Sequence, residues 1–80
     1  MNNGGITMEK MFKIKNLECA HCAEKMERAI NKIKGVNEAS ITFMTQKLFV
    51  DLDNNRYDEI IAEIDKAIKK VESQVSLEEA

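Results

Sequence analysis

The chain has 80 residues, of which 44% are hydrophobic and 32% are charged, and this is the size and composition of one small globular domain. Its 12 Lys and Arg residues are outnumbered by 14 Asp and Glu residues, which argues against binding along a nucleic acid backbone. No apolar run approaches the roughly 20 residues that cross a bilayer, and the N-terminal segment lacks the pattern of a secretory signal. We therefore expect a cytoplasmic domain that does not insert into a membrane.

The first half of the chain predicts a strand followed by a helix. Residues 1–10 form a polar lead without a periodic apolar face, and we predict that this lead is flexible. Apolar and charged residues alternate over 11–17, which is typical of a half-buried strand. From Cys19 onward apolar residues recur three or four positions apart, which predicts an amphipathic helix that ends near Gly35.

The second half predicts a hairpin, a second helix and a last short strand. Alternation over 39–43 and over 48–52 indicates two strands, although the turn between them lacks a glycine. Asn55 is predicted to cap a helix whose apolar stripe extends to Val71. Residues 75–77 alternate again and indicate an edge strand.

The order of these elements predicts the fold. Strand, helix, strand, strand, helix, strand within one domain over 11–78 is the split βαβ order, so we expect an α+β fold, the ferredoxin-like βαββαβ sandwich. In it two helices cover one face of a four-stranded antiparallel sheet. Core positions predicted from the periodicity include Ile30, Phe43 and Ile64.

Cys19 and Cys22, the only cysteines, carry the chemistry. A disulfide between them would close too short a loop to stabilise the fold, so we expect free thiols in a reducing compartment. At a junction between strand and helix both sulfurs can bind one metal ion, each about 2.3 Å from it for zinc. Cys22 falls in the first helical turn, where the helix dipole is expected to lower its pKa. A closed zinc site needs four ligands, and the sequence offers no further cysteine.

Three other side chains with donor atoms are not predicted to bind the metal. His21, the only histidine, lies between the cysteines and is expected to point outward, because ligation within the same chelate would be strained. Met26 lies on the apolar helical stripe and Met44 lies at a turn, so packing and surface roles are expected for them.

The segment LECAHCAEKME, which begins at Leu17, and a Gly-Val pair that ends the helix closely resemble heavy-metal-associated domains. The resemblance extends from about residue 11 to about residue 77. Members of that family are free metallochaperones or amino-terminal domains of metal-pumping P-type ATPases. The resemblance implies that the chain carries a metal on Cys19 and Cys22.

Glu18 directly precedes the first cysteine. An acidic residue at this place resembles the domains of zinc, cadmium and lead pumps, in which an Asp is usual and lends an oxygen to the ion. The resemblance thus implies a site for Zn²⁺, Cd²⁺ or Pb²⁺ made by Cys19, Cys22 and Glu18. Chemistry agrees, because Zn²⁺ accepts carboxylate oxygen whereas two thiolates satisfy Cu⁺. The other interpretation of Glu18 is a solvated acid favoured near a helix N-terminus.

Two other functions are open at this point. A copper(I) chaperone is the first, but copper-carrying members typically have Gly-Met-Thr before the first cysteine and Gly-Tyr after the second helix. This sequence has neither, and its one tyrosine, Tyr57, starts the second helix. A dithiol redox protein is the second, since thioredoxin-like sites also place CxxC at a helix start; the chain has no Pro and no Trp.

The expected partners are the metal ion and a metal-transporting ATPase or its membrane domain. We predict that the chain is not itself an enzyme, because it has no nucleotide-binding glycine loop and no aspartyl-phosphorylation motif. A monomer is expected, with a metal-bridged dimer at high concentration when a second copy completes the ligand set.

Overall fold

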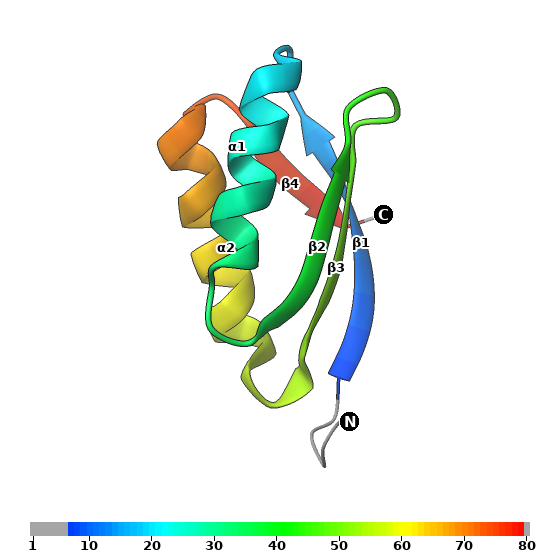
Figure 1. The fold of residues 1–80 in the computed structure, drawn as a ribbon, viewed down its shortest axis with the longest axis vertical. Helices are drawn as coiled ribbons and strands as arrows, with labels where there is room; N and C mark the ends of the chain where they lie inside the picture. Colours follow the sequence, from blue (N-terminus) through cyan, green and yellow to red (C-terminus); the bar gives the residue numbers. More distant parts are fainter. Residues whose placement is uncertain (1–6, 80) are drawn as a thin grey trace.

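The computed structural model describes residues 7–79. A four-stranded antiparallel sheet has the strand order β2-β3-β1-β4, and both helices cover one of its faces (Figure 1). The predicted ferredoxin-like fold is confirmed. Neither helix is long and apolar enough to cross a membrane. The elements are β1 (Thr7–Lys15), α1 (Ala20–Asn31), β2 (Val36–Thr42), β3 (Lys47–Asp53), the 3-10 turn η1 (Asn54–Arg56), α2 (Tyr57–Val71) and β4 (Ser76–Glu79).

The first strand begins at Thr7, four residues before the predicted start. Of the lead predicted to be flexible over 1–10, residues 1–6 lie outside the described residues, and the rest pairs with β3 from Thr7 opposite Asp53 onward. Met8 packs against the core. The alternation is weak here because Lys10 stands on the same face as Phe12 while the apolar Met11 is exposed on the other face, so the pairing partner in β3, distant in sequence, decides where the strand starts.

The hairpin reverses earlier than predicted. Phe43 lies in the turn 43–46 and is partly buried against the core, instead of ending the strand. Its carbonyl oxygen accepts a hydrogen bond of 3.2 Å from the backbone N–H of Gln46, which has a φ of 54°. Gln46 therefore adopts the left-handed conformation for which a glycine would be usual in such a turn.

The predicted cap of the second helix is wrong. Asn55 lies within η1, and its backbone N–H donates 2.9 Å to Oδ1 of Asp53. The helix α2 begins only at Tyr57 and has no side-chain cap. Asp53 stops β3 and caps the 3-10 turn, which leaves Asn55 inside a turn that the apolar pattern does not reveal.

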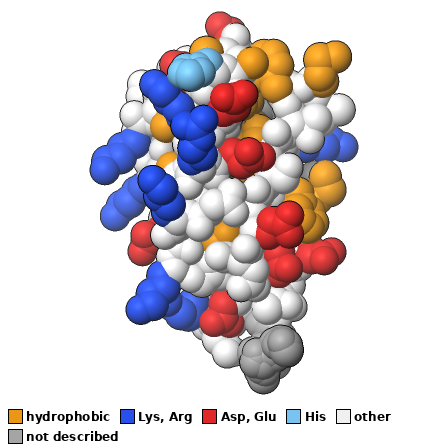
Figure 2. Space-filling view, viewed as in Figure 1, with side chains coloured by type: hydrophobic (Ala, Val, Ile, Leu, Met, Phe, Trp, Pro, Cys, Tyr) orange, Lys and Arg blue, Asp and Glu red, His pale blue; other side chains and the backbone are white. Residues whose placement is uncertain are grey.

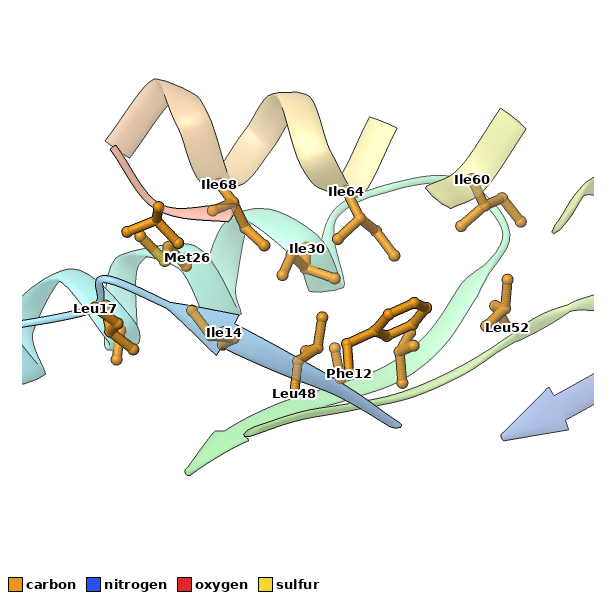
Figure 3. Packing of buried hydrophobic residues seen from close by; sticks show 14 residues of the cluster. Phe12, Ile14, Leu17, Met26, Ile30, Leu48, Leu52, Ile60, Ile64 and Ile68 are labelled. Atoms are coloured by element: carbon orange, nitrogen blue, oxygen red, sulfur yellow. The ribbon is translucent and has the colours of Figure 1, made fainter. Parts of the chain in front are cut away.

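The core fills the space between the helical layer and the sheet. Figure 3 shows isoleucines of α2 pointing toward side chains of α1 and of the strands. Ile30 and Ile64 are fully buried, as predicted. No polar or charged residue within 7–79 is buried, so burial of apolar surface is the main stabilising contribution. The buried residues are Phe12, Ile14, Leu17, Ala23, Met26, Ile30, Ala39, Leu48, Val50, Leu52, Ile60, Ile64, Ile68 and Val75.

Polar side chains of α1 bind the backbone of β2. The side-chain amide of Asn31 donates a hydrogen bond of 3.0 Å to the carbonyl oxygen of Ala39 and accepts one of 3.0 Å from the N–H of Ala39. One carboxylate oxygen of Glu27 accepts 2.9 Å from the N–H of Ile41. These contacts fix the position of α1, and with it the CxxC motif at its start, relative to the sheet.

Candidate metal centre

Three loops meet at one end of the molecule, called here the metal-site end: the β1–α1 loop (16–19), the β2–β3 turn (43–46) and the α2–β4 turn (72–75) (Figure 1). The side-chain amide of Gln46 donates to the carbonyl oxygen of Leu17. Leu17 itself is only 1% exposed. A buried side chain and a hydrogen bond therefore hold the backbone just before the first cysteine.

Cys19 is the N-cap of α1. Its backbone is extended, with φ −132° and ψ 117°, and its Sγ accepts a hydrogen bond of 3.3 Å from the N–H of Cys22. Its carbonyl oxygen accepts 3.0 Å from Ala23 in the first bond of the helix. The thiol thus takes the place that a Ser or Asp oxygen usually holds at a helix start.

Cys22 lies in the first turn of α1 and is half-buried, with its side chain against the core. Its Sγ donates to Oε2 of Glu72 across 3.5 Å. This carboxylate comes from the α2–β4 turn, 50 residues further along the chain. The fold, and not the local sequence, brings an acid against the second thiol.

The pKa values of the two thiols shift in opposite directions. The neighbouring thiol and the backbone N–H of Cys22 lower the pKa of Cys19 below its ordinary value. The pKa of Cys22 is raised to about 11 by its hydrogen bond to Cys19, by burial, and by Glu72. The predicted lowering at Cys22 is therefore wrong, because the extended N-cap residue accepts the helix N–H, while the residue inside the helix meets a second sulfur and a carboxylate.

Cys19 and Cys22 are brought together as predicted, but Glu18 is not assembled with them. Glu18 is exposed, and so is His21; the histidine, pale blue in Figure 2, lies at the metal-site end among charged side chains. Residues 7–79 contain no group of three or more His, Cys, Asp or Glu side chains that could hold a metal ion. Ligation by Glu18 stays a prediction, and it requires the flexible side chain to turn toward the sulfurs.

The methionines have the expected roles. Met26 is fully buried in the core, and Met44 at the hairpin tip is 89% exposed. Tyr57 lies at the opposite end of α2 from the metal-site end, and its hydroxyl donates 3.3 Å to a carboxylate oxygen of Glu79. The hydrogen bonds around the two cysteines, from the N–H of Cys22 to Cys19 and from Cys22 to Glu72, involve none of these side chains.

The sequence interpretation missed Glu72. In the sequence it is one acid among many, in a stretch that is notable only for lacking the Gly-Tyr pair of copper-carrying domains. The signal that could have found it is the topology: in a βαββαβ fold the α2–β4 turn lies at the same end as the β1–α1 loop, so every acid in that turn is a candidate neighbour of the CxxC motif.

The fold and the paired thiols define a small metal-binding domain, and the sequence matches the family model of the heavy-metal-associated domain over residues 11–73. The chain belongs to this family. It is 39% identical, over 74% of its length, to a zinc/cadmium/lead-transporting P-type ATPase of Shigella sonnei, but it covers only 8% of that protein. The chain thus spans less than a tenth of the length of this curated relative.

Two solved structures show the same architecture. The N-terminal domain of ZntA in the apo form superposes with a TM-score of 0.72 at 33% identity, covering 94% of both chains. The N-terminal domain of a potential copper-translocating P-type ATPase from Bacillus subtilis, in the Cu(I)-loaded state, superposes with a TM-score of 0.76 at 26% identity, covering 92% of this chain and 88% of that one. The fold is therefore common to domains named for different metals, and the metal has to be argued from the site.

Proposed function

We propose that the chain binds a divalent soft or borderline ion, Zn²⁺, Cd²⁺ or Pb²⁺, through Cys19 and Cys22 and hands it to a metal-transporting P-type ATPase. The observation that supports this most is the pair of free, half-buried thiols at the start of α1, one from the N-cap residue and one from the first helical turn. Glu18, on the same loop, is the proposed oxygen ligand. The likeness to a zinc/cadmium/lead transporter supports the same metals.

The charge of the proposed ligand set favours a divalent ion. Two thiolates and a carboxylate together carry three negative charges, and a carboxylate oxygen is a good ligand for Zn²⁺ but a poor one for Cu⁺. The likeness to a copper-loaded domain keeps copper(I) as the competing cargo. We infer the divalent ion because Glu18 directly precedes Cys19 in the sequence and can supply the oxygen ligand.

Transfer is proposed to proceed by ligand exchange. Cys19, Cys22 and Glu18 leave one of the four positions preferred by Zn²⁺ for water, a group of a partner, or a second copy of the domain. An incoming thiolate can bind there before the original ligands leave, so the ion is never released free. If the chain is part of a pump, the proposal places it on the cytoplasmic side of the membrane, where thiols stay reduced.

Competition titrations test the choice of metal. We expect tight Zn²⁺ binding by the wild-type domain, a loss of about tenfold or more in Glu18→Ala, and no loss in the matched control Glu63→Ala, an exposed acid on α2. Cu⁺ that stays bound in the presence of bicinchoninate, together with unchanged Zn²⁺ affinity in Glu18→Ala, would contradict the proposal and favour a copper carrier.

A further inference from the structure

The backbone of Glu72 is fixed on both sides. Its N–H donates a hydrogen bond of 3.0 Å to the carbonyl oxygen of Ile68 in the last turn of α2. Its own carbonyl oxygen accepts a hydrogen bond of 3.2 Å from the N–H of Val75. Both of these neighbours are fully buried. Because the core anchors the turn before and after Glu72, the carboxylate extends from a fixed point toward the cysteines.

The side chain of Glu72 is held as well. One carboxylate oxygen accepts from the thiol of Cys22, and the other accepts from the side-chain amide of Gln74. The carbonyl oxygen of Gln74 in turn accepts 3.1 Å from the side-chain amide of Asn16, the residue that starts the β1–α1 loop. A chain of hydrogen bonds therefore ties the α2–β4 turn to the loop that carries the cysteines.

The distance between sulfur and oxygen is the one that a zinc site requires. With a Zn–S bond of about 2.3 Å and a Zn–O bond of about 2.1 Å, two ligands at the tetrahedral angle lie about 3.6 Å apart. Sγ of Cys22 and Oε2 of Glu72 lie 3.5 Å apart. A zinc ion can thus replace the thiol proton between them without either ligand atom moving far.

We propose that Glu72 is a carboxylate ligand of the divalent ion on Cys19 and Cys22, positioned by Gln74, and that it selects divalent over monovalent metal. This inference rests on the proposed function and deepens it. On binding, the ion displaces the proton of Cys22 to solvent and takes its place between sulfur and oxygen. In the loaded monomer Glu72 takes the fourth position beside Cys19, Cys22 and Glu18, and during transfer it is the ligand that an incoming group of the partner replaces while both sulfurs remain bound.

The same geometry explains selectivity. A Cu⁺ ion bound by two thiolates in a near-linear arrangement leaves the carboxylate of Glu72 without a bond and adds only one positive charge next to it. A divalent ion gains the oxygen ligand and offsets more of the negative charge. Removing the carboxylate should therefore weaken Zn²⁺ binding and leave Cu⁺ binding almost unchanged.

The test uses Glu72→Gln, which keeps the shape and removes the charge, beside the matched control Glu63→Gln. We expect Zn²⁺ affinity to fall by roughly 10–100-fold in Glu72→Gln, Cu⁺ affinity to change by less than about threefold, and circular dichroism of the metal-free protein to stay the same. Gln74→Ala should lower Zn²⁺ affinity in the same direction by a smaller factor.

A direct readout comes from NMR of the side-chain carboxyl carbons. On adding Zn²⁺ to the wild-type domain, the carboxyl resonance of Glu72 should shift and that of Glu63 should not. An unshifted resonance with unchanged Zn²⁺ affinity in Glu72→Gln overturns the inference, and so does an equal loss of Zn²⁺ and Cu⁺ affinity. If instead wild-type protein and Cys22→Ser bind Zn²⁺ equally, the proposed function itself fails.

Discussion

The core and the metal-site end of this domain are built on different principles. Between the helices and the sheet every buried residue within 7–79 is hydrophobic, whereas at the metal-site end single polar contacts join one loop to the next. The two non-glycine residues with positive φ among the described residues, Asn16 at 69° and Gln46 at 54°, both lie at that end, and each is tied by a side-chain hydrogen bond to a neighbouring loop. The comparison predicts that stability and metal binding depend on separate sets of residues.

The largest expected effect separates the two regions most clearly. Cys19→Ser should weaken Zn²⁺ binding by about 1,000-fold, because losing a ligand costs more than the 10–100-fold typical of a supporting residue, while the fold stays intact. Competition titration measures the affinity, and circular dichroism without metal measures the fold. An unfolded Cys19→Ser protein would show that the thiol has a structural role and would break the comparison.

A substitution in the core should have the opposite effect, a loss of stability without a loss of metal affinity. Ile64→Ala leaves a cavity at a fully buried position and should lower the free energy of unfolding by about 2–5 kcal/mol. Denaturant melts measure this loss. At concentrations where the variant remains folded, its Zn²⁺ affinity should equal that of the wild type; a large loss of affinity would show that the two regions are coupled.

Gly35, at the end of the molecule opposite the metal-site end, has a backbone conformation that only glycine adopts without strain. Its φ is +100°, and an added Cβ would lie 2.5 Å from Cδ1 of Ile60. Gly35→Ala should therefore lower the free energy of unfolding by about 1–3 kcal/mol through backbone strain, with more from the clash. Thermal melts compare it with Asn37→Ala, an exposed position in β2, which should stay close to the wild type.

Metal affinity should fall as the pH falls. The pKa of Cys22 is raised to about 11, so this thiol is protonated between pH 6 and 8 and must lose its proton when the ion binds. Each proton released makes the affinity rise by about tenfold per pH unit. Zn²⁺ titrations at several pH values within this window measure the slope, and a flat profile would mean that the thiols are already ionised.

The smallest effect concerns the open face of the sheet. Asp51 stands opposite Glu9 on one side and Glu38 on the other, and its Oδ1 is buried without a hydrogen-bond partner among the described residues. Asp51→Asn should raise the free energy of unfolding by about 0.2–1 kcal/mol by removing like-charge repulsion. Asp53→Asn is the matched control. The carboxylate of Asp53 accepts a hydrogen bond from the N–H of Asn55, so removing its charge should not raise the free energy of unfolding.

Periodicity was enough to predict the four strands, the two α-helices and their order. Buried positions such as Ile30 and Ile64 follow from spacing alone, since each helix has one continuous apolar stripe. The early start of β1 and the turn at Phe43 do not follow from spacing, because partners in other strands decide them. The sequence prediction therefore succeeded for local patterns and was less accurate where a strand begins or a chain reverses.

The candidate site was predictable only in its local part. The spacing of Cys19 and Cys22 marks them as a pair, but their different pKa values depend on which one caps the helix and which one meets Glu72. That carboxylate is 50 residues from Cys22 in sequence. No window of sequence joins the two, so the contact becomes visible only when the topology is known.

The contacts between α1 and β2 have a consequence for how copies of the domain behave when crowded. β2 is an edge strand, and an edge with free N–H and carbonyl groups can recruit a strand of another molecule into a continuous sheet. Here Asn31 and Glu27 already bind the backbone groups of Ala39 and Ile41. The helix thus occupies three backbone groups that a strand of another molecule would need for pairing, which disfavours strand addition at this part of the edge.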